Sequence, residues 1–262
     1  QVLSLSNQEY TNYMKSAKLS TNSANTAMVK RVGQRLATAV ETYLNEHGMA
    51  ADAKEYSWEF NLVQDKSVNA FCMPGGKIVV YEGLLPITQD EASLAIVLGH
   101  EIAHAVAKHS AEQMSKQIKN QYGTQILGQV LNAAGVSSST TQLAQIIAQK
   151  GLQFRSLKYS RDNESEADHM GLIFAAMAGY DPNVAVTFWQ RMAQATGSNN
   201  QSDIFSDHPS DAKRIAAIKQ ELPEALTYYK PVKTTTTTKK TTTSTKKKTR
   251  TTSKKKTTTR RK

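Results

Sequence analysis

The sequence predicts an α+β domain that is rich in helix, with a small and mostly antiparallel sheet, followed by a disordered basic tail. Three observations lead to this prediction. Over most of the first 230 residues, apolar side chains recur at helical spacing. Residues 56–81 instead show short β-branched and aromatic runs. Residues 231–262 consist almost entirely of Thr, Lys and Arg. We therefore expect one domain over residues 1–230 and a separate tail over 231–262.

Two helices are expected within residues 1–50. The first covers residues 6–20 and begins with Ser6 and Glu9 in the spacing of a capping box. The second covers residues 26–47 and is followed by Gly48 as a C-terminal stop. Its apolar stripe consists of Met28, Val32, Leu36, Val40, Tyr43 and Leu44.

Three strands are expected in the runs YSWEFNLV, SVNAFCM and KIVVY of residues 56–81. Pro74-Gly75-Gly76 separates the last two runs, as a turn between antiparallel strands would. Cys72 is the only cysteine and lies in the apolar run NAFCMP, which favours a small buried thiol over a nucleophile. A single cysteine excludes an internal disulfide framework and a zinc site made of several cysteines.

The rest of the domain is expected to be helical. One helix begins with a capping box of Thr88 and Glu91 and continues through DEASLAIVLGHEIAHAVAKHS to Ser110. The other helices are expected over 111–134, 140–154 and about 162–178, then from near Pro182 and from near Pro209. No window holds 18 uninterrupted apolar residues, so we expect no membrane-spanning helix.

The net charge of +11 comes from the tail. Of the 33 basic residues, 13 lie from Pro231 onward, where there is no acidic residue. The preceding 230 residues therefore hold 20 basic and 22 acidic groups, a net charge of −2. The tail has too few apolar residues to fold and serves either solubility or attachment to a polyanion such as nucleic acid, anionic lipid or a cell-envelope polymer. It has no aromatic residue and no fold with which to read bases, so sequence-specific nucleic-acid binding is not expected.

The segment GHEIAHAVAKHS, residues 99–110, contains a candidate metal site. His100 and His104 are four residues apart, so on a helix both imidazoles can reach one Zn²⁺ from the same face. Glu101 follows the first histidine and can take a proton from a water on the metal. The motif is short enough to occur by chance in a helix rich in histidine. The residues around it therefore decide whether it marks a metal site. His109, nine residues from His100, is expected about 180° round the helix and away from the metal.

A site with two histidines needs a third ligand. The run SRDNESEAD offers Glu164 as that ligand and Asp168, four residues on, as a carboxylate that orients one of the imidazoles. The alternative is a solvated acidic helix face, which the presence of the histidine pair makes the weaker interpretation.

HEIAH, SRDNESEAD and DHPSDAKRI, in this order, resemble the gluzincin metallopeptidases of the CAAX-prenyl-protease and HtpX type. Within them, the soluble bacterial envelope members of the BepA-like and LoiP-like kind are the most similar. The resemblance covers about residues 55–222 as the catalytic core and implies a zincin-type domain. It implies one zinc ion per chain, bound by His100, His104 and Glu164, with Glu101 as the general base. It also implies catalytic positions near the metal for His208 and Arg214.

In gluzincins the substrate backbone adds to an edge strand beside the zinc. The resemblance makes KIVVY the candidate for this strand, with Lys77, Ile78, Val79, Val80 and Tyr81. Unlike such relatives, the chain is expected to have no transmembrane helix and no helical repeat after the catalytic part. Partner recruitment by such a repeat is therefore not implied.

These features predict a zinc-dependent metalloendopeptidase that cleaves unfolded or misassembled polypeptides. The alternatives are an envelope chaperone or assembly factor with latent protease activity, and a polyanion-binding protein that acts through its basic tail. The first residue, Gln1, and the bacterial relatives favour the periplasm or cell envelope after removal of a signal peptide. A single reduced cysteine is equally compatible with the cytoplasm.

Overall fold

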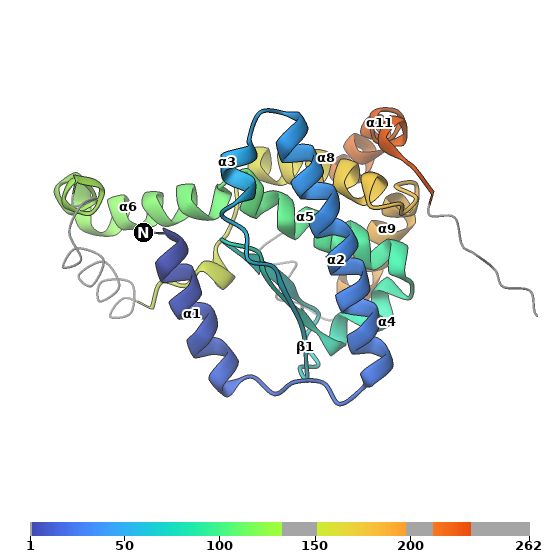
Figure 1. Ribbon diagram of the computed structural model, residues 1–262, viewed down its shortest axis with the longest axis horizontal. Coiled ribbons are helices and arrows are strands. Elements are labelled where there is room, and N and C mark those ends of the chain that lie inside the picture. The colour runs from blue at the N-terminus through green and yellow to red at the C-terminus, as the bar shows by residue number, and fades with distance from the viewer. Residues whose placement is uncertain (1, 133–150, 198–211, 232–262) are drawn as a thin grey trace, which may run out of the picture. The chain divides into compact units, whose positions relative to one another are not determined.

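The computed structural model describes residues 2–132, 151–197 and 212–231, all within one structural unit (Figure 1). The predicted tail from residue 232 onward and most of the predicted helix 140–154 lie outside these residues. The elements are α1 (Val2–Ser16), α2 (Ser23–Glu46), α3 (Ala50–Ala53), β1 (Glu59–Val63), β2 (Ala70–Met73), β3 (Lys77–Tyr81), η1 (Glu82–Leu84), α4 (Leu85–Thr88), α5 (Glu91–Val106), α6 (His109–Asn132), η2 (Phe154–Ser156), α8 (Arg161–Met177), α9 (Val184–Gly197) and α11 (Ala212–Tyr228).

The three strands form a mixed sheet in the order β1-β3-β2. β2 and β3 are antiparallel and are joined by the turn at Pro74–Gly76, where Gly75 and Gly76 both have positive φ. β1 runs parallel to β3, with Glu59 opposite Lys77 and Val63 opposite Tyr81. The prediction of a mostly antiparallel sheet is thus right for only one of the two strand pairs. The expectation that KIVVY lies at an edge of the sheet is wrong, because β3 is the central strand and pairs on both sides.

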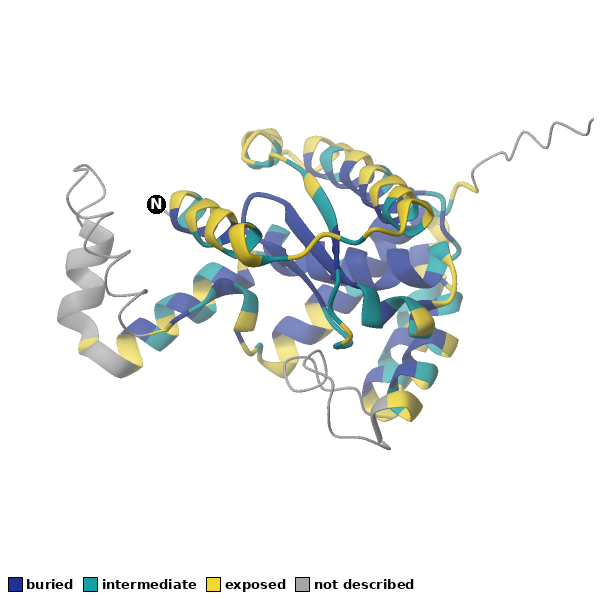
Figure 2. Cartoon of the chain, turned by 90° about the horizontal axis from the view of Figure 1, so that it is seen from below, coloured by how far each residue is buried: buried dark blue, intermediate teal, exposed yellow. Residues whose placement is uncertain are grey.

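The two faces of the sheet are covered by different segments (Figure 1). α2 and α5 pack on the face that carries Cys72, Ile78 and Val80, and α2 contributes most of the stripe predicted for it. α1 and residues 152–157 pack on the face that carries Phe71, Val79 and Tyr81. Figure 2 shows the strands buried between these layers. Cys72 is buried, and burial raises the pKa of its thiol, as expected for a structural cysteine.

Both predicted capping boxes are wrong. α1 begins four residues before Ser6, whose hydroxyl donates to the carbonyl of Pro74 at 2.8 Å. α5 is capped by Asp90, which accepts from the Ser93 N–H at 2.7 Å, and Thr88 belongs to the preceding α4. Ser6 and Thr88 could each cap a helix, but their hydroxyls instead donate to the carbonyls of Pro74 and Leu85. None of the described helices combines the length and apolar character needed to cross a bilayer.

α5 and α8 approach each other backbone to backbone at Gly99 and Gly171. A Cβ on Gly99 would lie 2.7 Å from the carbonyl oxygen of Gly171, and a Cβ on Gly171 would lie 2.7 Å from the backbone nitrogen of His100. No real side chain tolerates these distances, so the two helices can be this close only with glycine at both positions. The contact therefore fixes how near the histidines of α5 lie to the acidic residues of α8.

We predict that Gly171→Ala lowers the free energy of unfolding by about 1–3 kcal/mol, because the added methyl group forces the two helices apart. Urea denaturation of the wild type and the variant measures this. Ser165→Ala, on the exposed side of α8, is the control and should change stability by less than about 0.5 kcal/mol. A Gly171→Ala protein as stable as the wild type would contradict the steric account.

Candidate metal centre

His100 and His104 of α5 and Glu164 of α8 meet in the interior of the protein. One donor atom from each side chain lies within 4.8 Å of the other two, and all three residues are buried. His100 Nε2 lies 3.4 Å from Glu164 Oε2, and His104 Nε2 lies 3.3 Å from Glu164 Oε1. The two Nε2 atoms lie 3.1 Å apart. The helical spacing of the histidines and the capping of α8 by Ser160 place these atoms together.

This set of donors suits Zn²⁺. Two imidazole nitrogens and one carboxylate oxygen are the protein ligands of many catalytic zinc sites, and they leave a fourth position for water or substrate. The residues present therefore fit one zinc ion. Because the donor atoms already converge, little rearrangement is needed to bind it.

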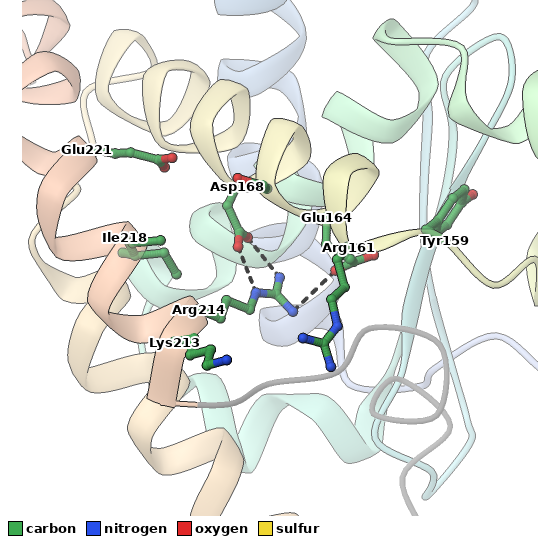
Figure 3. Close-up of a pocket in the computed structure, with 10 residues that line it drawn as sticks. Tyr159, Arg161, Glu164, Asp168, Lys213, Arg214, Ile218 and Glu221 are labelled. Atoms are coloured by element: carbon green, nitrogen blue, oxygen red, sulfur yellow. Dashed lines mark hydrogen bonds and ion pairs between the residues drawn. The ribbon is translucent and has the colours of Figure 1, made fainter.

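The Nδ1 side of His100 contacts a buried ion pair of Asp168 and Arg214. Its Nδ1 lies 2.9 Å from Asp168 Oδ1. Arg214 of α11 donates from Nε and Nη2 to the two oxygens of Asp168, each at 2.7 Å, and its Nη1 lies 3.2 Å from Glu164 Oε2 (Figure 3). The guanidinium also stacks over the ring of Trp189, 3.9 Å from its centroid. Arg214 thus contacts both Asp168 and Glu164 and positions these two carboxylates.

The carboxylates determine the charge of His100. Burial disfavours its imidazolium, but Glu164 and Asp168 outweigh burial and raise the pKa of His100 to about 9. The pKa of Asp168 is also set by opposing effects: burial raises it, but Arg214 and His100 lower it by more, so that it falls below its ordinary value. Without metal, His100 is therefore protonated at neutral pH and Asp168 is ionised.

His104 has a different support, and here the expectation for His109 is wrong. His109 was expected to face away from the metal, but it is buried and its Nδ1 lies 2.9 Å from Nδ1 of His104. The expectation assumed one continuous helix. Instead α5 ends at Val106, Lys108 has φ of 59°, and a separate helix, α6, begins at His109.

Glu101, directly after His100, is also buried. Burial raises the pKa of the Cys72 thiol in β2, and the charge of Glu101 adds to this effect. His208 lies outside the described residues. Lys77, Ile78, Val79, Val80 and Tyr81 are all buried in the central strand.

Sequence reasoning missed three residues that contact the site. Tyr159 stacks on the His104 ring with 3.9 Å between centroids, and Trp189 covers Arg214. Glu166 contacts His109. Glu166 lies within the acidic run SRDNESEAD, and Tyr159 directly precedes this run. The two aromatic residues have no local pattern that distinguishes them from core residues.

The fold and the site are those of a metallopeptidase with an HExxH motif, in which Glu164 is positioned to join the two histidines around a metal ion. The family model of peptidase family M48 matches residues 23–222, and the chain belongs to this family. The expected resemblance to gluzincins of the CAAX-prenyl-protease and HtpX type is confirmed at this level.

Curated relatives come from mitochondria and bacteria. The mitochondrial metalloendopeptidase OMA1 of Schizosaccharomyces pombe is 41% identical over 172 residues, covering 65% of this chain and 48% of the relative. OMA1 of Arabidopsis thaliana is 36% identical over 193 residues, covering 73% and 37%. The beta-barrel assembly-enhancing protease of Escherichia coli K12 is 30% identical over 186 residues, covering 66% and 37%. The chain thus spans about half or less of the length of these relatives.

We predict that zinc affinity rises with pH up to about pH 9, because the zinc ion must displace a proton from His100, whose pKa is raised to about 9. One displaced proton gives a slope of about tenfold per pH unit. Competition with a chromophoric chelator between pH 6 and 9 measures it. In Asp168→Asn, which removes one of the charges that raise the pKa, affinity should level off at lower pH. An affinity that stays constant between pH 7 and 9 would contradict the assignment.

Proposed function

We propose that this chain is a zinc-dependent endopeptidase that hydrolyses peptide bonds. The observation that carries the proposal is the convergence of His100, His104 and Glu164 around one point, with Glu101 beside the first histidine. A zinc ion bound there supplies a Lewis acid for the scissile carbonyl and makes a bound water more acidic. Membership of peptidase family M48 supports the same reaction.

Each side chain then has a distinct task. Glu101 accepts a proton from the attacking water and delivers it to the leaving amine, as a positioned general base and acid. Asp168 and Arg214 hold His100 and Glu164 in place. We propose that His208 helps to stabilise the developing oxyanion, a role that the family resemblance supports.

We further propose β2 as the strand to which an extended substrate adds. β1 is partly covered at its outer edge, since Leu19 forms a bridge with Val63 and Ser20 donates to the carbonyl of Leu62. Within the described part of the chain, no backbone hydrogen bond occupies the outer edge of β2. β2 also packs against the active-site helix α5, with Cys72 near Glu101. These contacts support β2 in place of the central strand.

A cavity between α8 and α11 opens beside the ligand Glu164 (Figure 3). Its lining is mixed: Tyr159 and Ile218 are largely apolar, while Arg161 and Lys213 are cationic. We propose that a substrate side chain next to the scissile bond enters this cavity.

Unfolded or misassembled proteins remain the proposed substrates, which the name of the bacterial relative, a beta-barrel assembly-enhancing protease, supports. The periplasm or cell envelope is the compartment we propose on the same ground, although other relatives are mitochondrial by name. Contact of residues 231–262 with a polyanion is a proposal that the charge of this segment supports.

We predict that Glu101→Gln retains zinc but hydrolyses peptides about 10²–10⁴-fold more slowly than the wild type, because the amide cannot accept the proton. Metal content and cleavage of a casein or peptide substrate should be measured on the same preparations. Glu112→Gln, on the exposed face of α6, is the matched control and should keep full activity. Undiminished hydrolysis by Glu101→Gln would refute its role as general base. Zinc bound to both proteins with no hydrolysis by the wild type would favour a binding or assembly role.

A further inference from the structure

The two histidine ligands are supported by different groups. His100 Nδ1 contacts a buried carboxylate, Asp168, which Arg214 holds through two hydrogen bonds. His104 Nδ1 contacts another imidazole, that of His109, and both of these residues are at most 2% exposed. His109 Nε2 in turn lies 3.1 Å from Glu166 Oε2. Glu166 is half-exposed, since 57% of its side chain is accessible to solvent.

The hydrogen-bond chemistry of this chain of groups has one consistent solution. His104 Nε2 faces Glu164 and His100 Nε2, so it is the nitrogen that presents its lone pair to the metal. The proton of the neutral imidazole of His104 must then be on Nδ1, from which it donates to Nδ1 of His109. His109 consequently carries its own proton on Nε2 and donates it to Glu166. Every donor in the series meets an acceptor.

We propose that His109 is a positioning residue for the metal ligand His104, and that Glu166 orients His109. This inference rests on the zinc site of the proposed function and extends it to residues that do not touch the metal. A ligating histidine whose second nitrogen is bonded is fixed in both tautomer and ring orientation, and loss of such a partner costs about 10–100-fold in metal affinity.

The local fold supports the proposal. Lys108 is held in the left-handed region, which is unfavourable for a residue with a side chain and persists only where surrounding contacts require it. This break between α5 and α6 is what turns His109 back toward His104. Tyr159 stacks on the other side of the arrangement, with its ring 21° from the plane of His104 and its hydroxyl 2.9 Å from Ser110 Oγ. The imidazole of His104 is thus fixed at its edge by His109 and on its face by Tyr159.

The test measures zinc affinity of the full chain by chelator competition, independently of catalysis. We expect His109→Ala to bind zinc about 10–100-fold more weakly than the wild type. His109→Asn should restore most of the affinity, because its side-chain oxygen can take the place of Nδ1 as acceptor. His169→Ala is the matched control, since His169 is also on a helix near acidic residues but pairs with Glu224 away from the metal centre. Circular dichroism and thermal melting of the metal-free proteins report folding.

Several results would overturn the proposed positioning role of His109. If His109→Ala binds zinc as tightly as the wild type, His109 does not position His104, while the zinc site stands. If His109→Asn is as weak as His109→Ala and both are folded, the ring acts by packing alone. If His109→Ala does not fold, Glu166→Ala provides the test, because it changes a half-exposed side chain. Weaker zinc binding by Glu166→Ala supports the proposed positioning of His104, and unchanged binding overturns it. Failure of the wild type to bind zinc would refute the proposed function as well as the positioning role of His109.

Discussion

The site depends on the close approach of α5 to α8 at Gly99 and Gly171. The histidines belong to one helix and the glutamate to another that begins about sixty residues later in the chain, so no local pattern can bring their donor atoms together. A Cβ at either glycine would lie within 2.7 Å of the opposite backbone. The absence of two side chains therefore sets the separation of the helices, and this separation sets the distances among the ligands.

The buried charges explain why a cation belongs at this position. Glu101, Glu164 and Asp168 are buried carboxylates, and Arg214 is the buried cation among the described residues that contacts this cluster. With neutral imidazoles the cluster carries a net charge of −2, which is costly in an interior of low dielectric constant. A divalent ion offsets that charge. In its absence a proton on His100 offsets part of it, in agreement with the direction of its pKa shift.

The sequence predicted the site better than it predicted the fold around it. The spacing of His100 and His104 and the acidic run around Glu164 depend on helix periodicity, which is a local property. The position of KIVVY in the sheet is not local: nothing in that run indicates that a parallel partner covers its second edge. His109 was misplaced because Ala107 and Lys108 favour helix, so the break that reorients His109 has no signature in composition. Arg214 was identified through resemblance, but its bidentate contact with Asp168 required the structure.

The central claim is that His100, His104 and Glu164 bind one zinc ion. Anomalous diffraction at the zinc edge, from crystals of the full chain grown with zinc, tests it most directly. The account predicts one strong peak at about 2.0–2.2 Å from Nε2 of both histidines and from a carboxylate oxygen of Glu164. A peak bound to other side chains, or a Glu164 carboxylate outside coordination distance of an ion on the two histidines, would contradict it.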